Sequence, residues 1–270
     1  MKSAPSWTVR MFYSRHPQAA ALVAAFSLFF MIGCAGRAPK MEIPEASPEG
    51  AEKLMANLSK LIPAFEGDFS LSFQAFLFKG TFFGQCWLKT PDQFAAELKA
   101  PLGIRAGEVV ISDGVYELNM GNGQMESGNV DSLDFAALTG LALPTDNFMT
   151  LFDPMPRPPS AGAQTIHFEV LGDDSLWLWT LDDEGMEHQI ELAPRKWQIR
   201  SETWYTPKGD MVLKKLYRDY KSIDGAPVAH KLKISAKGKL PVVVELTFNR
   251  VKANPRWKET PFQFKWASKP

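Results

Sequence analysis

The chain has 270 residues, of which 45% are hydrophobic, 22% charged and 12% aromatic. This composition is too apolar for intrinsic disorder. The 30 Lys and Arg residues balance 30 Asp and Glu residues, so bulk charge argues against a basic nucleic-acid binder. Two cysteines exclude a disulfide-dense scaffold and a Cys-rich metal cluster.

The N-terminal segment has the pattern of a secretory signal. Residues 1–18 carry Lys2, Arg10 and Arg15 without an acidic residue, and residues 19–32 are apolar apart from Ser27. A basic stretch followed by a short apolar run predicts export, because a membrane-spanning helix needs about 20 apolar residues.

Cys34 follows this apolar run directly, in the sequence Met31-Ile32-Gly33-Cys34. The position is that of the lipidated cysteine in bacterial lipoprotein signals. We therefore predict a signal peptide at 1–33, a tether at 34–47 beginning with a lipidated Cys34, and one domain at 48–270. The alternatives are an uncleaved anchor and an ordinary signal peptide with a chance cysteine. The resemblance to bacterial lipoproteins implies that Asp after the cysteine would favour inner-membrane retention, so Ala35 predicts the outer membrane, on its periplasmic face.

The first element of the domain is a predicted helix over 48–62. Ser47 and Pro48 are typical of a helix start, and apolar residues such as Leu54 and Leu58 recur at helical spacing until Pro63. From Phe65 the apolar residues alternate instead, which indicates strands at 82–88, 93–98, 108–111 and 115–120 after a first strand around 69–73.

The middle of the chain interrupts the strand pattern. Short helices are predicted after Asp131 and after Thr145, and four prolines at 153–160 predict a rigid loop. Seven further strands are predicted at 165–171, 176–181, 186–192, 198–205, 211–220, 229–236 and 242–251. About eleven strands with a few helices predict a mainly β fold, with a curved antiparallel sheet forming a half-closed barrel beneath a helical lid.

No catalytic, metal or cofactor motif is found. The histidines of the domain, His167, His188 and His230, lack a partner at metal-ligand spacing, and no nucleophile elbow, dinucleotide fingerprint or P-loop is present. Cys86 lies in an apolar strand pattern and is predicted to be buried. We expect no enzyme activity, and an envelope hydrolase is the least favoured alternative.

One stretch resembles a known family. Ala100-Pro101-Leu102-Gly103 lies between strands, and Leu138-Thr139-Gly140-Leu141-Ala142-Leu143-Pro144 is followed by Leu151-Phe152. These segments are similar to the LolB-type outer-membrane lipoprotein receptors of the LolA/LolB lipoprotein-localisation fold. The resemblance implies a hydrophobic cavity and a protruding loop that touches the membrane, with Leu102, assisted by Ile104, as the inserting residues.

The predicted function is to bind the acyl chains of lipoproteins or lipids in that cavity and deliver them to the outer membrane, in partnership with a soluble LolA-like periplasmic carrier. The alternative is a structural or assembly lipoprotein with a filled core. The residues predicted to line the cavity are Phe73, Phe82, Trp87, Leu98, Val110, Tyr116, Phe148, Leu151, Trp177, Trp179 and Trp204. Their facing depends on strand register, because a slip of one residue inverts it.

Overall fold

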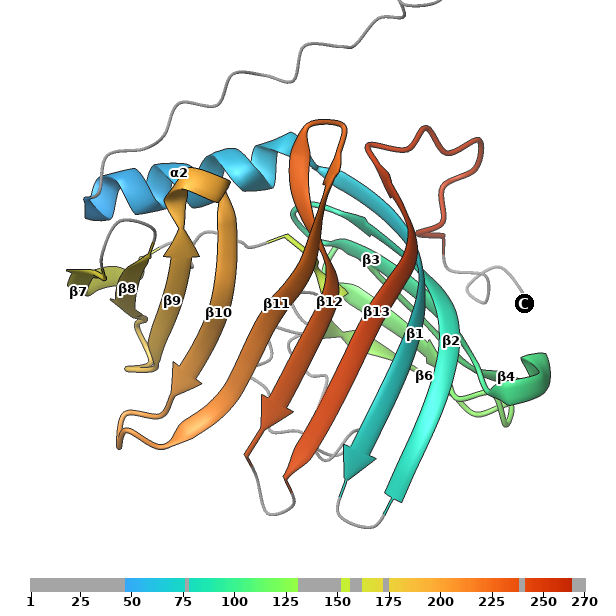
Figure 1. The fold of residues 1–270 in the computed structure, drawn as a ribbon. Helices are drawn as coiled ribbons and strands as arrows, with labels where there is room; N and C mark the ends of the chain where they lie inside the picture. The colour runs from blue at the N-terminus through green and yellow to red at the C-terminus, as the bar shows by residue number, and fades with distance from the viewer. Residues whose placement is uncertain are drawn as a thin grey trace, which may run out of the picture. The chain divides into compact units, whose positions relative to one another are not determined.

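The computed structural model describes residues 47–75, 78–130, 152–155, 162–171, 175–237 and 241–263. The predicted helices after Asp131 and Thr145 lie outside these residues, as does most of the proline-rich stretch. The described part contains the helix α2 (Pro48–Leu61), the short 3-10 turns η1 (Pro101–Gly103) and η4 (Pro194–Lys196), and thirteen strands (Figure 1). In this part of the chain, no helix is long and apolar enough to cross a membrane.

The strands are β1 (Ala64–Ala75), β2 (Phe78–Lys89), β3 (Gln93–Lys99), β4 (Arg105–Ser112), β5 (Val115–Asn119), β6 (Met125–Asn129), β7 (Gln164–Val170), β8 (Leu176–Leu181), β9 (Glu187–Ala193), β10 (Gln198–Tyr205), β11 (Met211–Ile223), β12 (Ala226–Ala236) and β13 (Val242–Ala253). The sequence pattern located nearly all of them. It missed β6, whose residues are mostly polar and exposed.

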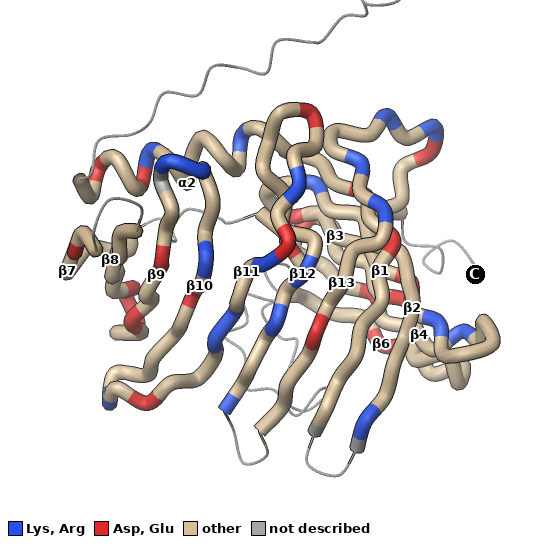
Figure 2. Tube along the Cα trace, viewed as in Figure 1, with Lys and Arg blue, Asp and Glu red and all other residues tan. Residues whose placement is uncertain are grey.

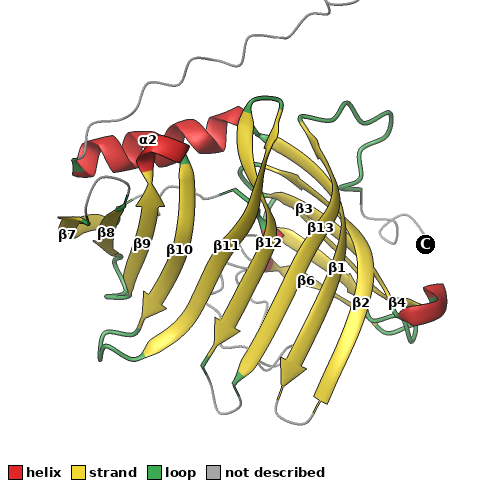
Figure 3. Cartoon of the chain, in the orientation of Figure 1, coloured by secondary structure: helices red, strands yellow, loops and turns green. Residues whose placement is uncertain are grey.

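All thirteen strands form one sheet in the order β6-β5-β4-β3-β2-β1-β13-β12-β11-β10-β9-β8-β7. Strands that follow one another in the chain are neighbours in the sheet, except that β6 and β7 form its two edges, and the first strand pairs antiparallel with the last. A sheet with so many strands curls because strand twist accumulates. Figure 3 shows this curl, with β3 to β6 passing behind β11 to β13. The predicted curved, unclosed antiparallel sheet is confirmed.

The helix α2 begins as predicted and ends one residue earlier. The Ser47 Oγ accepts a hydrogen bond from the Gly50 amide at 3.0 Å, and Pro48 occupies the first turn. Leu54, Met55 and Leu58 are fully buried in the same core cluster as the sheet residues. The Thr165 hydroxyl donates to Glu52 at 2.8 Å, which joins the helix to β7. The helix therefore covers part of one face of the sheet.

The two faces of the sheet differ in composition. On β1, Phe65 and Phe69 are buried and pair with apolar residues, whereas Glu66 and Asp68 point to the opposite side. We call the first side the core face and the other the outer face. Across β11 to β13 and β1 the outer face carries ion pairs such as Lys233–Glu245 and Arg250–Asp68. Figure 2 shows the mixed charges along these strands, as expected for a solvated surface.

Candidate functional site: an apolar loop and the pocket beside it

The turn between β3 and β4 holds the most exposed apolar side chain of the described residues. Leu102 is 99% exposed and Ile104 is 63% exposed. The backbone closes the turn tightly, because the Ala100 amide donates to the Ile104 carbonyl at 2.7 Å. Leu102 also has a φ of +64°, a left-handed conformation that a leucine rarely adopts. The fold therefore holds an apolar side chain in water at the cost of backbone strain.

Other exposed apolar residues lie at the same end of the sheet. Phe83 is 48% exposed and pairs with Lys99, directly before the loop. Met120 and Met125 flank the β5–β6 turn and are 37% and 49% exposed. The β5–β6 turn approaches β4 closely, since a Cβ added at Gly121 would lie 2.6 Å from the Ala106 carbonyl oxygen.

We call Phe83, Leu102, Ile104, Met120 and Met125 the tip patch. Figure 1 shows η1 projecting beyond the strands, next to the turn that follows β5. Leu102 and Ile104 were predicted from the sequence, whereas Phe83, Met120 and Met125 were not. Met120 and Met125 could have been suggested by their place around the Gly121-Asn122-Gly123 turn, where an apolar residue is unexpected.

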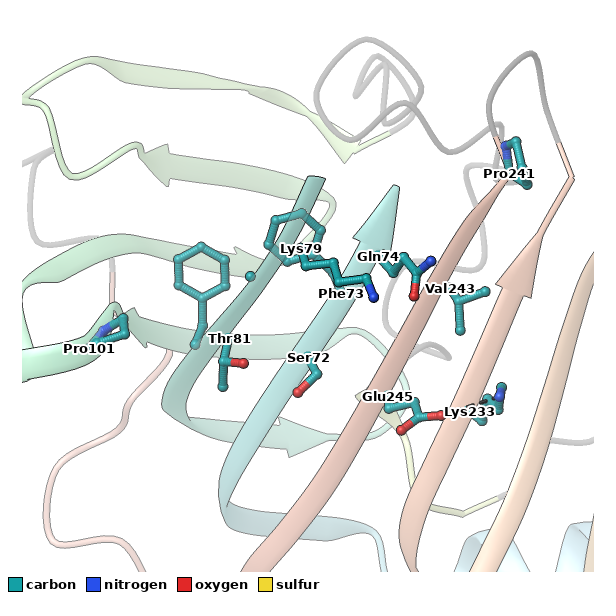
Figure 4. A pocket seen from close by; sticks show the side chains of 12 residues that line it. Ser72, Phe73, Gln74, Lys79, Thr81, Pro101, Lys233, Pro241, Val243 and Glu245 are labelled. Atoms are coloured by element: carbon teal, nitrogen blue, oxygen red, sulfur yellow. Dashed lines mark ion pairs between the residues drawn. The ribbon is translucent and has the colours of Figure 1, made fainter. Parts of the chain in front are cut away.

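A pocket of about 1000 Å³ lies beside the loop (Figure 4). β3 ends opposite Phe83, so residues 78–82 of β2 have no strand on that side. The pocket extends along this part of β2 and reaches β13 and β12. Its lining residues are Ser72, Phe73, Gln74, Lys79, Gly80, Thr81, Phe82, Pro101, Lys233, Pro241, Val243 and Glu245.

The pocket combines aromatic and polar groups. Phe73 and Phe82 stack with their ring centroids 5.8 Å apart and their planes 12° apart. Phe73 fits because it pairs with Gly80, and a Cβ at Gly80 would lie 2.2 Å from the Phe73 ring. Lys233 and Glu245 form an ion pair of 3.3 Å, drawn as a dashed line in Figure 4. The two rings lie on the core face, whereas Ser72, Gln74, Thr81 and the ion pair lie on the outer face, so the aromatic and polar groups line the pocket from opposite sides of the sheet.

The predicted cavity residues divide between the two faces. Phe73, Phe82, Leu98, Tyr116 and Trp204 belong to the core face. Trp87 and Val110 were predicted wrongly, because they point to the outer face and pack there with Ala95 under Phe262. Trp177 and Trp179 are also on the outer face, since Leu176 and Leu178 between them are fully buried in the core. Phe148 and Leu151 lie outside the described residues.

Much of the core face is covered by protein. Phe152 contacts Phe69 of β1 and Phe94 of β3, with ring centroids 6.0 Å and 5.3 Å away. Trp204 is buried and stacks on His188 at 4.3 Å. The buried Tyr116 donates a 2.6 Å hydrogen bond to Glu126, which raises the pKa of Tyr116 to about 12. These residues belong to the packed core, and Phe73 and Phe82 are the described members of the predicted set that line the pocket beside the loop.

The core face also buries a polar cluster that sequence reasoning missed. Lys215 on β11 is 1% exposed and pairs across the strands with Glu202 of β10, which is 3% exposed. The Tyr217 hydroxyl donates to Glu202 at 2.6 Å, and the Lys215 ammonium donates to the Asp153 carbonyl at 2.8 Å. Residues 152–155 are thus attached to β11 as well as to β1 and β3.

Burial dominates the protonation of this cluster. Burial raises the pKa of Glu202, and the Lys215 charge opposes that rise. Burial, together with the Lys215 charge, lowers the pKa of His188 to about 3. His188 is therefore neutral near pH 7, with its Nε2 3.8 Å from the Glu202 carboxylate. Cys86 is buried as predicted, and its burial raises the thiol pKa.

Comparison with known proteins gives the fold. No family model matches the sequence, and neither does any curated protein. Similar solved structures include a LolA superfamily protein from Nitrosomonas europaea, with a TM-score of 0.56 and 10% identity over 76% of this chain and 94% of that one. A DUF1329 family protein from Desulfovibrio piger has a TM-score of 0.63 and 10% identity over 81% of this chain and 98% of that one. A proposed outer membrane lipoprotein-sorting protein domain from Vibrio parahaemolyticus has a TM-score of 0.59 and 11% identity over 80% of this chain and 97% of that one.

The chain therefore has the LolA-like fold that the resemblance predicted. At such low identity the likeness concerns the fold alone. The narrower assignment to LolB-type receptors is not established by these neighbours and stays a prediction.

Proposed function

We propose that the protein is an envelope carrier that binds the acyl chains of lipoproteins or lipids and delivers them to the outer membrane. The observation that carries this proposal is the tip patch, in which Leu102 is 99% exposed beside an amphiphilic pocket. The fold neighbours support the same class of function, because one of them is described as a domain for sorting outer membrane lipoproteins.

The tip patch has the chemistry needed to touch a membrane. Complete burial of one Leu or Ile side chain contributes about 1.5–3 kcal/mol, so a few such residues orient the protein on the bilayer without anchoring it. Anchoring is assigned to the lipid on Cys34, with residues 34–47 as the tether. Two or more acyl chains hold a protein stably, whereas one chain does so only marginally.

The pocket beside the loop provides the place where cargo is held during delivery. Phe73 and Phe82 offer apolar contact to an acyl chain on the core face, while Ser72, Gln74 and Thr81 line the pocket on the outer face. Transfer needs an affinity for the acyl chain that increases from the soluble LolA-like carrier to this protein and from this protein to the bilayer. It needs no covalent chemistry. We therefore assign no catalytic residue, cofactor or metal to the protein.

A structural or assembly lipoprotein is the second candidate, and the covered core face favours it. Helix α2 and residues 152–155 already bury the middle of that face. In this alternative the tip patch contacts another envelope component, and no acyl chain enters the protein.

Lipid extraction separates the two candidates. We expect the purified full chain to carry acyl lipids detectable by mass spectrometry beyond those on Cys34, and Phe82→Gln to lose most of them. Ile166→Gln is the matched control, because Ile166 is also a partly exposed apolar strand residue but lies on β7, outside the pocket and the tip patch. Equal lipid content in both variants, or none in the unmodified protein, would favour the structural alternative.

A further inference from the structure

The loop end of the sheet carries three exposed lysines besides the tip patch. Lys99 is the last residue of β3 and leads into the loop that holds Leu102. Lys79 is the second residue of β2, and Lys237 directly follows β12. The ends of β1, β2, β12 and β13 lie next to one another in the sheet. We call Lys79, Lys99 and Lys237, all of which are exposed, the basic rim.

The pocket beside the loop connects the basic rim to the tip patch. Its lining includes Lys79, Pro101 of the loop and Pro241, which directly precedes β13. Lys79 lies on the outer side of this pocket together with the hydroxyl residues Ser72 and Thr81 (Figure 4). Figure 2 shows the blue of Lys and Arg at the lower ends of β12 and β2. The lysines and the apolar loop therefore border one continuous surface.

The charge of the basic rim is not neutralised within the described residues. None of its three lysines has an ion-pair partner there. Two carboxylates nearby are held by other cations, since Glu245 pairs with Lys233 and Glu108 pairs with Arg105. The three ammonium groups thus remain available to a negative partner outside the protein.

Other acidic residues at this end of the sheet lie beyond β11. Residues 182–184 form part of the turn between β8 and β9, which is separated from β12 by β10 and β11. Asp210 precedes β11 and shares its turn with Lys208. The positive surface is consequently confined to the stretch from β12 to β3, which is also the stretch next to Leu102.

We propose that the basic rim docks the loop end of the protein onto an anionic phospholipid bilayer. This inference rests on the proposed function and adds the class of lipid that the protein recognises. The rim extends over five neighbouring strands, which is about 20 Å at the usual strand spacing. Such a width exceeds a single phosphate group and matches a charged surface.

The combination of lysines and apolar side chains is what a membrane contact requires. A lysine can lay its aliphatic stem along apolar surface while its ammonium stays among the head groups, so the rim can pair with lipid phosphates as Leu102 enters the bilayer. Each lysine close to an anionic membrane strengthens binding about fivefold, and the attraction fades beyond a Debye length of about 8 Å at physiological ionic strength.

Vesicle sedimentation of the full chain tests the proposal. The chain carries Cys34→Ser, so that no acyl anchor obscures the binding. The rim variant combines Lys79→Gln, Lys99→Gln and Lys237→Gln. Its control combines Lys53→Gln, Lys221→Gln and Lys258→Gln, which remove the same charge from exposed lysines on α2, near the far end of β11 and after β13. Both variants keep residues 1–46, so any contribution of that segment cancels.

We expect the rim variant to bind vesicles with about one third phosphatidylglycerol at least tenfold more weakly than the control variant. The two should bind pure phosphatidylcholine vesicles equally. Their difference should also vanish in 1 M NaCl, where the Debye length falls to about 3 Å. Circular dichroism of both variants should show an intact sheet, because all six lysines are exposed.

Equal binding of the two variants to the anionic vesicles would overturn the proposal, and so would a difference that persists on phosphatidylcholine. Leu102→Glu, measured alongside, separates this inference from the proposed function. If Leu102→Glu weakens binding to both kinds of vesicle while the rim and control variants agree, the loop contacts the membrane and the basic rim is refuted. If only the rim variant loses binding, the rim is supported and insertion of the loop is refuted.

Discussion

Two regions of the molecule reverse the usual distribution of residues. At the loop end of the sheet, Leu102 and Ile104 are apolar and exposed, whereas under residues 152–155 Lys215 and Glu202 are charged and buried. The buried charges have partners that account for them, since Lys215 donates to Asp153 and Glu202 accepts from Tyr217. The exposed apolar residues have no such partner among the described residues. The buried charged cluster therefore stabilises the fold, whereas the exposed apolar loop is open to contact with a component outside the protein.

Lys215→Met is the most damaging change that we predict. It leaves the Glu202 carboxylate buried without its cation and should lower the free energy of unfolding by about 3 kcal/mol. Urea denaturation measures this loss. Unchanged stability would show that the cluster contributes little to the fold.

The pH dependence of the free energy of unfolding tests whether His188 is buried and neutral in the folded protein. His188 takes up a proton near pH 6.5 when unfolded but only near pH 3 when folded, so its contribution is present above pH 6.5 and is lost as pH falls. Between pH 6 and pH 4 this group alone should reduce the free energy of unfolding by about 2 kcal/mol.

His188→Phe keeps a flat ring on Trp204 and removes the titration. The stability difference between the unmodified protein and this variant should change across that pH interval. His230, whose pKa is also lowered, is the same in both proteins and cancels in the difference. Parallel pH curves would contradict the assignment.

Leu102→Glu tests the exposed region. It should leave folding intact, because the side chain makes no buried contact, and slow transfer of a lipoprotein from a soluble carrier to vesicles about tenfold or more. Leu171→Glu is the matched control, since Leu171 is exposed next to the opposite edge of the sheet. Equal transfer rates for the two variants would show that the loop does not take part in delivery.

The smallest effect is expected on the outer face. Lys233→Met breaks an exposed ion pair with Glu245 and should change the free energy of unfolding by about 0.5 kcal/mol or less. The same urea titration as for Lys215→Met measures it. A loss comparable to that of Lys215→Met would mean that burial does not distinguish the two lysines.

Sequence periodicity identified the strands but could not decide which face of some strands is buried. In Leu176-Trp177-Leu178-Trp179 both alternating sets are apolar, so the pattern allows either set in the core. The structure buries the leucines fully and places the tryptophans on the outer face. Trp87 and Val110 were misplaced for a related reason, because a distant C-terminal segment covers the outer face there.

The candidate site was predicted in part. Leu102 could be found because a Pro-Leu-Gly turn between strands resembles a known loop, and a leucine at a turn is conspicuous. Lys215 could not be found, because Lys214-Lys215 within an alternating strand has the pattern of a solvated face. Its burial depends on Asp153, 62 residues away, and sequence periodicity carries no information about such a contact.

The most direct test of the account is whether the loop enters a bilayer. A polarity-sensitive fluorophore is attached at Leu102→Cys in a chain that also carries Cys34→Ser, so that the remaining native cysteine is Cys86, which is buried and shielded from labelling. On addition of phospholipid vesicles we predict a blue-shifted, brighter emission from position 102 and no change from the same label at Leu171→Cys. Emission at position 102 that stays water-like in the presence of vesicles would contradict the central claim.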